Sequence, residues 1–196
     1  MSRFLSTFSL LLLASLAMAQ PHSLHWLNTT PINVEVVQVD ADDQGNSFAV
    51  GHFSSQLIIG QDTLTAGGSL NVFVAKYDVN GNPLWARKFG GSSNDIVYGM
   101  GVDPLGFVYV TGSQRSSMTV AGTVFPTNQY GDFYLLKYAP NGNLLFALHA
   151  GTTSGESGEN IGFDAQGNVY VAGSMGNALT IGTTTLPQEG VASAFV

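Results

Sequence analysis

The chain repeats itself with a period of 61 residues. The stretch VFVAKYDVNGNPLWARKFGG, residues 72–91, returns as FYLLKYAPNGNLLFALHAGT, residues 133–152, with no gap between the copies. A third copy follows in the same register. Repeats of this kind mark architectures in which each unit buries its apolar surface against the next unit. The positions that recur in all three copies are Asp42, Asp103 and Asp164; Gly45, Gly106 and Gly167; Gly51, Gly112 and Gly173; Leu57, Met118 and Leu179; Ile59, Val120 and Ile181; and Phe73, Tyr134 and Phe195.

Each unit has the sequence pattern of a small antiparallel sheet. In the second copy, strand-like runs such as FVYVTG and DFYLLKYA alternate with turns such as PNGN. β-Branched and aromatic residues favour strands, and an Asn-Gly pair between two strands favours a tight hairpin. No sustained helical period of apolar residues occurs after the N-terminal segment. The pattern predicts four strands in up-and-down order, with a small extra hairpin between the second and third strands.

Two features predict how the units assemble. The middle strands are apolar on both alternating faces, as in Phe133–Tyr138, so both faces of each sheet are covered. Glycines occur inside the first strand of a unit, at Gly99, Gly101 and Gly162, and glycine in a strand often marks close backbone approach. A β-propeller, whose blades stack face to face with the glycine-bearing strand innermost, meets both conditions. A β-sandwich is the alternative, but it leaves the gapless repeat unexplained.

The composite pattern FVAKYDVNGNPLWARKFGG followed by GVDPLGFVYVTG resembles the SBBP repeat family of exported bacterial proteins. The resemblance extends over residues 34–196 and implies an all-β fold of propeller blades, but no defined activity, because propellers support many functions. Three positions depart from the family pattern, since Ala139 stands for Asp, Phe107 for Asn and Phe146 for Trp.

The repeat register divides the chain into segments. We expect the repeats at 34–94, 95–155 and 156–196, after an N-terminal lead at 20–33. The third copy stops within a strand, which predicts an incomplete ring and an N-terminal fragment of a longer protein. Assembly of several copies into one ring is the alternative.

Residues 1–19 resemble a secretory signal peptide. A basic start at Arg3 is followed by the apolar run FLSTFSLLLLASLA and by Ala17-Met18-Ala19, which predicts cleavage between Ala19 and Gln20. A membrane anchor is the alternative, although the apolar run is short for a span of about 20 residues. The signal predicts a secreted or cell-surface protein with no membrane span after cleavage.

Composition excludes several classes of function. The net charge is −7 and only 10% of the residues are charged, so the clustered Lys and Arg side chains that bind nucleic acid are not expected. The chain contains no cysteine, which excludes disulfides, thiolate chemistry and Cys-based metal sites. We expect no cofactor.

Two acidic segments are candidate sites. Asp40 and Asp42 lie in DADDQGN and resemble a calcium loop, but only the Asp42 position recurs, which favours an Asx turn. Glu156 and Glu159 lie in GESGEN; paired carboxylates can hydrolyse glycosides, but the Gly/Ser context favours a solvated loop. We therefore assign no catalytic, metal-binding or cofactor-binding residue.

Aromatic and cationic residues complete the list of candidates. Lys76 and Lys137 recur beside tyrosines, which favours a structural role with the ammonium group in water. Trp85 has Phe146 as its repeat equivalent, which favours packing in the outer strand, and Trp26 in the lead has no equivalent. The sequence predicts a non-enzymatic exported propeller that binds a protein or glycan ligand. The alternative is a carbohydrate-active enzyme, a lyase or a glycosidase, with its site in further blades.

Overall fold

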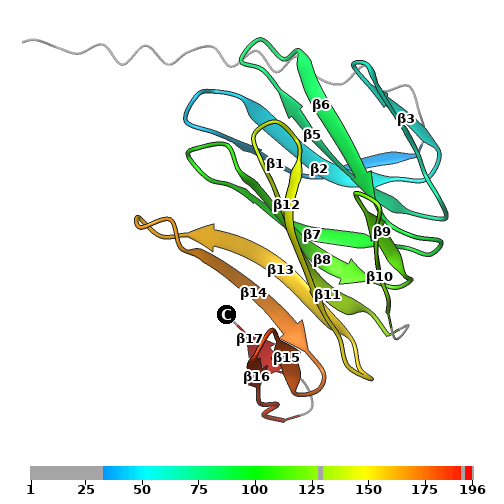
Figure 1. Ribbon diagram of the computed structural model, residues 1–196, viewed down its shortest axis with the longest axis vertical. Helices are drawn as coiled ribbons and strands as arrows, with labels where there is room; N and C mark the ends of the chain where they lie inside the picture. The colour runs from blue at the N-terminus through cyan, green and yellow to red at the C-terminus, as the bar shows by residue number, and fades with distance from the viewer. Residues whose placement is uncertain (1–32, 128–129, 191–192, 196) are drawn as a thin grey trace, which may run out of the picture.

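The computed structural model describes residues 33–127, 130–190 and 193–195, and all regular secondary structure in these ranges is β-strand. The strands form three successive antiparallel sheets, which Figure 1 shows stacked as a fan, with the blue and cyan sheet at the top and the orange and red sheet at the bottom. The order within each sheet is up-and-down, as predicted. The fold is all-β, its sheets are β-propeller blades, and the sheets do not close into a ring within the described residues.

The first sheet contains β1 (Val34–Ala41), β2 (Ser47–Phe53), β5 (Asn71–Tyr77) and β6 (Pro83–Phe89); the second contains β7 (Ile96–Val102), β8 (Val108–Gln114), β11 (Asp132–Tyr138) and β12 (Leu144–Ala150); the third contains β13 (Glu156–Phe163), β14 (Val169–Met175) and β17 (Ser193–Phe195).

A short hairpin lies between the second and third strands of every sheet, as the sequence predicts. These hairpins do not extend the sheets: the two strands of each hairpin pair with each other, and Thr119 of the second hairpin also forms an isolated bridge with Gly90. Their inward side chains are buried, with Leu57, Met118 and Leu179 each no more than 1% exposed. The three hairpins are β3 (Gln56–Ile59) with β4 (Asp62–Thr65), β9 (Met118–Val120) with β10 (Thr123–Phe125), and β15 (Leu179–Ile181) with β16 (Thr184–Leu186).

The apolar core lies between the sheets. One cluster joins Val74 of β5 to Val110 of β8 and includes Met118 of the second hairpin, which is therefore wedged between the first and second sheets. Alternate residues of β11 face opposite clusters: Tyr134 packs toward the first sheet, and Phe133 packs toward the third. The prediction that the middle strands are covered on both faces is thus confirmed for the second sheet.

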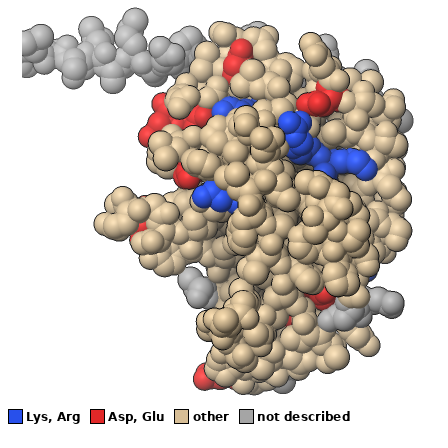
Figure 2. Space-filling view, in the orientation of Figure 1, with Lys and Arg blue, Asp and Glu red and all other residues tan. Residues whose placement is uncertain are grey.

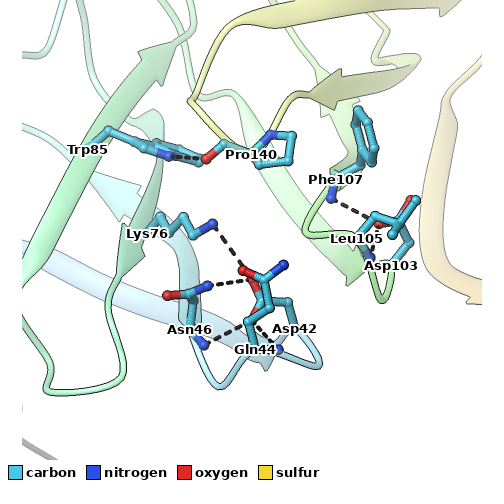
Figure 3. Close-up of polar contacts among 9 residues, drawn as sticks. All are labelled: Asp42, Gln44, Asn46, Lys76, Trp85, Asp103, Leu105, Phe107 and Pro140. Atoms are coloured by element: carbon cyan, nitrogen blue, oxygen red, sulfur yellow. Dashed lines mark hydrogen bonds and ion pairs between the residues drawn. The ribbon is translucent and has the colours of Figure 1, made fainter.

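The conserved spacing of aspartates along the repeat produces one recurring turn. The Oδ1 atom of Asp42 accepts hydrogen bonds from the backbone N–H groups of Gln44 (3.0 Å) and Asn46 (2.9 Å), and Asp103 makes the same bonds to Leu105 and Phe107 (Figure 3). Asp164 repeats the arrangement in the third sheet. The predicted Asx turns are confirmed, and they satisfy backbone donors that the strands leave unpaired.

Turns of one sheet rest on the sheet before it. Gly106, at φ +80°, lies against Asp42 and Lys76, and Gly142, at φ +81°, lies against the indole of Trp85. A Cβ atom at Gly142 would lie 2.8 Å from Cδ2 of Trp85, so glycine is needed here both for its left-handed backbone and for its size. Arg87 adds a hydrogen bond from its Nε to the Gly142 carbonyl oxygen (3.0 Å).

The first strands of the three sheets lie next to one another. The side chain of Gln38 in β1 makes two hydrogen bonds with the backbone of Met100 in β7 (2.8 and 2.9 Å). On the other side of β7, a Cβ atom at Gly99 would lie 2.8 Å from the carbonyl oxygen of Glu159 in β13, and one at Gly101 would meet Phe163. These contacts confirm the close approach predicted from the glycines in this strand.

Candidate functional site

The three innermost strands carry a β-bulge at the same repeat position. The pairing register shifts around Val37 in β1, around Tyr98 in β7 and around Glu159 in β13. A bulge leaves one residue out of the ladder and can redirect its side chain. All three residues are exposed, Val37 by 37% and Tyr98 by 44%. We call Val37, Tyr98 and Glu159 the bulge row.

The bulge row differs chemically from blade to blade, although its backbone is the same. It presents an aliphatic, an aromatic and a carboxylate side chain on neighbouring strands. Ser157 donates a hydrogen bond to Oε1 of Glu159 (3.2 Å) and is itself linked to Ser174 (2.9 Å). The row therefore offers both an apolar contact and a hydrogen-bonding group along the inner edge of the sheets.

A buried acid lies at the start of β7 and of β13, three residues before the bulge, in each of the two connections between the sheets. Asp95 precedes β7 and is fully buried; Glu156, its repeat equivalent, begins β13 and is 1% exposed. The Glu156 carboxylate accepts hydrogen bonds from the backbone N–H and the hydroxyl of Thr152. The interpretation of Glu156 as part of a solvated loop is therefore wrong, because the connecting loop folds around its carboxylate; Glu159 is exposed, as expected.

Asp95 holds the first connection in the same way. Its Oδ2 accepts a hydrogen bond from the backbone N–H of Gly91 (2.6 Å). Burial raises the pKa of Asp95 to about 6, and the backbone hydrogen bonds from Gly91 and Arg115 oppose the shift. Its Oδ1 is buried and has no hydrogen-bond partner among the described residues. The carboxylate thus ties the Gly91 loop to the loop at the end of β8.

His52 makes a further contact between the first two sheets. Its Nε2 accepts a hydrogen bond from the Val97 N–H (3.0 Å), so the proton of the neutral ring is on Nδ1, which lies 3.4 Å from Oε2 of Glu35. Ser113, the repeat equivalent, instead donates its hydroxyl to the carbonyl oxygen of Glu156 (2.9 Å). Different side chains thus perform the same linking role at one repeat position.

An open groove lies beside the Asp95 loop. Its volume is about 490 Å³, and it is lined by Ser93, Arg115, Ser116, Ser117 and Thr127. The backbone N–H of Ser93 donates to Oγ of Ser116 (3.0 Å), which joins the two walls. We call this feature the serine–arginine groove. It was missed from the sequence, although one signal exists: the positions equivalent to Arg115 in the other copies are Ser54 and Gly176.

The residues of the possible calcium loop have other partners. Asp42 uses Oδ2 to accept a hydrogen bond from the Asn46 amide (2.8 Å) and lies 3.6 Å from Nζ of Lys76 (Figure 3). Burial alone would raise the pKa of Asp42, but the hydrogen bonds from Asn46 and the charge of Lys76 outweigh it, and the pKa is lowered. Asp40 accepts the backbone N–H of Val102 across the sheets (2.8 Å). Both carboxylates therefore have structural roles.

The recurring lysines are structural, but not in the expected way. Lys76 is 6% exposed, and its ammonium lies 5.0 Å from the centre of the Phe48 ring, so the prediction that it reaches water is wrong. Lys137 lies over the rings of Phe107 and Tyr109, at 4.6 and 4.7 Å. Both ammonium groups lie over aromatic faces, but Lys76 is buried whereas Lys137 is half-buried.

Trp85 is confirmed as a packing residue, because it is 6% exposed and its Nε1 donates to the Pro140 carbonyl oxygen (3.0 Å). Trp26 and the proposed cleavage site at Ala19 and Gln20 lie outside the described residues. Within the described ranges no helix is long and apolar enough to cross a membrane. The same ranges contain no group of three or more His, Asp or Glu side chains that could hold a metal ion.

Comparison with known proteins agrees with this architecture. Residues 84–113, which run from β6 through the Asp95 loop to β8, match the SBBP family, described as a beta-propeller repeat. An alignment 130 residues long, which covers 60% of this chain, is 27% identical to an uncharacterized WD repeat-containing protein of Acanthamoeba polyphaga mimivirus. The match covers 9% of that relative's length. The three sheets are thus β-propeller blades, and residues 84–113, which pass from the first sheet to the second, match the SBBP repeat.

Proposed function

We propose that this protein is an exported propeller scaffold that binds a protein or glycan ligand at the cell surface or outside the cell. One observation carries the proposal: side chains that hold turns recur between the copies, whereas several exposed side chains differ from copy to copy. Asp42 and Asp103 hold turns in the first two sheets, while the bulge row and Arg115 change from copy to copy on the surface. A constant frame with variable exposed side chains is the arrangement that repeat proteins use for binding.

The surface is suited to recognition rather than to general electrostatic attraction. Figure 2 shows few charged side chains on the visible face, most of which is uncharged. The net charge is −7, which disfavours non-specific binding of polyanions. Contacts would depend on hydrogen bonds and on aromatic or aliphatic side chains such as those of the bulge row.

The competing function, a carbohydrate-active enzyme, needs a carboxylate that can reach the sugar. Asp95 and Glu156 are both buried, and their oxygens accept hydrogen bonds from loop backbone groups. These contacts give the two acids a structural role. The exposed acid of the bulge row, Glu159, makes its hydrogen bond to Ser157.

Export and binding require separate measurements. For export, the full chain with a C-terminal tag is expressed in a bacterial host, the fractions are separated and the intact mass is measured. We expect extracellular or surface-bound protein that begins at Gln20. A protein that keeps residues 1–19 inside the cell would contradict export.

For binding, the same protein is screened on a glycan array and by capture of surface proteins, beside a polysaccharide-depolymerisation assay. Saturable binding without cleavage supports the scaffold. Cleavage of a polysaccharide would favour the enzyme instead.

A further inference from the structure

We propose that the serine–arginine groove binds an anionic saccharide. In this site Arg115 pairs with the carboxylate or sulfate of the sugar, and the serine and threonine hydroxyls bond its ring hydroxyls. The inference rests on the proposed binding function and names the ligand class and one site. The volume of about 490 Å³ is within the range of small-molecule sites and accommodates one or two sugar rings.

The charge of Arg115 is available to a ligand. Lys76 and Arg87 each lie 3.6 Å from an aspartate oxygen, whereas the Arg115 guanidinium forms no ion pair with any described residue. Arg115 is exposed. A guanidinium presents planar paired donors that match a carboxylate or a sulfate. The fold does not require a cation here, because serine and glycine occupy the equivalent positions, Ser54 and Gly176.

The groove is built on a fixed base. The buried Asp95 carboxylate accepts backbone hydrogen bonds from Gly91, two residues before Ser93 of one wall, and from Arg115 of the other wall. The bond between Ser93 and Ser116 joins the same walls nearer the surface. Because both loops are anchored before a ligand arrives, less conformational entropy is lost on binding.

The lining favours a sugar over a peptide. All five residues of the groove are serine, threonine or arginine, so no apolar side chain is present to anchor a peptide side chain. Hydroxyl groups both donate and accept hydrogen bonds, which suits the hydroxyls of a sugar ring. One unpaired cation among four hydroxyl-bearing side chains matches a sugar with one acidic group.

The test uses the full-length exported protein and defined oligosaccharides in calorimetric titration. The probes are oligogalacturonate for carboxylates, chondroitin sulfate oligosaccharides for sulfates, and neutral maltooligosaccharides as the uncharged comparison. We expect at least one acidic probe to bind. Comparison of the carboxylate probe with the sulfate probe then shows which of the two groups the site prefers. The neutral probe should bind at least tenfold more weakly.

Two variants of Arg115 and one control variant locate the site. Arg115→Ala should weaken the acidic probe at least tenfold, and Arg115→Lys should recover part of the loss. Lys88→Ala removes an exposed cation from the outer strand and should leave binding unchanged. Thermal melting of each variant checks the fold. We expect it to be intact in the Arg115 variants, because serine and glycine occupy the equivalent positions Ser54 and Gly176.

The outcomes separate this inference from the broader function. Equal binding by wild type and Arg115→Ala would overturn the groove as the site and leave the scaffold standing. Capture of a protein, with no acidic saccharide bound at millimolar concentration, would overturn the saccharide and leave the scaffold standing. Failure of every ligand class in the array and capture screens would contradict the scaffold itself.

Discussion

The indole Nε1 of Trp85 donates a hydrogen bond over 3.0 Å to the carbonyl oxygen of Pro140, and so joins the outer strand of one blade to a turn of the next. Phe146 occupies the same repeat position one blade later and is 40% exposed, against 6% for Trp85. One position of the repeat therefore has two different energetic roles.

Alanine substitution should reveal this difference. We expect Trp85→Ala to lower the free energy of unfolding by about 3–5 kcal/mol, because it leaves a cavity between two blades and an unpaired carbonyl. Phe146→Ala should cost about 1 kcal/mol or less, since much of its ring already contacts water. Urea denaturation of both variants measures the difference, and equal losses would contradict the role given to the contact with Pro140.

The second hairpin contains a strained residue. Ala121 has φ +46°, at the position that Gly60 and Gly182 occupy in the other hairpins at φ +60°. A left-handed backbone costs a non-glycine residue about 1–2 kcal/mol, part of which the greater freedom of unfolded glycine offsets. We expect Ala121→Gly to stabilise the protein by about 0.5–1 kcal/mol and to raise its melting temperature.

The adjacent position provides the control for this change. Gly122 has φ +84°, and no described residue lies within 4 Å of an added Cβ, so Gly122→Ala should destabilise through backbone strain alone. A lower melting temperature for Ala121→Gly would show that the strain is absent.

Removing the hydroxyl group of Tyr77 and that of Tyr134 should have different effects on the stability of the protein. The Tyr77 hydroxyl is buried and has no hydrogen-bond partner among the residues that the structure describes, and burial raises its pKa. The Tyr134 hydroxyl donates to the Ile96 carbonyl oxygen (2.9 Å). We expect Tyr77→Phe to leave stability unchanged or to raise it by up to about 1 kcal/mol, and Tyr134→Phe to lower it by about 1–2 kcal/mol. Chemical denaturation of the pair is the measurement, and the reverse order would refute the assignment.

Asp95 should give the protein a characteristic pH dependence. Its folded pKa of about 6 lies above the ordinary value of 3.8, so the folded state binds the proton more tightly than the unfolded state does. Its contribution to stability is therefore greatest below pH 4, falls as the pH rises toward 6, and is constant above that. The shift corresponds to about 2 kcal/mol between pH 4.5 and pH 7.

The variant Asp95→Asn isolates this contribution. Asp42 and Asp164 have lowered pKa values and act in the opposite direction, so the test compares variant with wild type at each pH. Relative to wild type, Asp95→Asn should be more stable at pH 7 than at pH 4.5, by about 2 kcal/mol. Tyr134, whose pKa is affected by Asp95, stays neutral over this range. A difference that does not change with pH would show that Asp95 is not desolvated.

Much of the fold could be predicted because its causes repeat in the sequence. The Asx turn of Asp42 returns at Asp103 and Asp164, and the close approach of the inner strands follows from Gly99. A turn that lacks the repeated aspartate has another side chain to hold it. Where Ala139 replaces Asp, the Asn141 side chain accepts a hydrogen bond from the backbone N–H of Asn143 (3.1 Å). Periodicity reports on interactions that every copy needs.

The candidate sites were harder to predict, because they depend on what differs between copies. The burial of Glu156 could not be read from its Gly/Ser surroundings, since only the folded connection brings Thr152 onto its carboxylate. The sequence indicates that the Lys76 ammonium is solvated, because it does not show that the Asp42 turn of the same sheet lies beside it in the fold. The groove of Arg115 is formed by three segments, at Ser93, at residues 115–117 and at Thr127, and no local motif marks it.

The bulges of the inner strands have an evolutionary consequence. A side chain outside the ladder and outside the core can be exchanged at little cost in stability. The positions of Val37, Tyr98 and Glu159 therefore tolerate substitution on a backbone that stays the same. Substitutions at these positions could change binding specificity one blade at a time without disturbing the packing of the sheets.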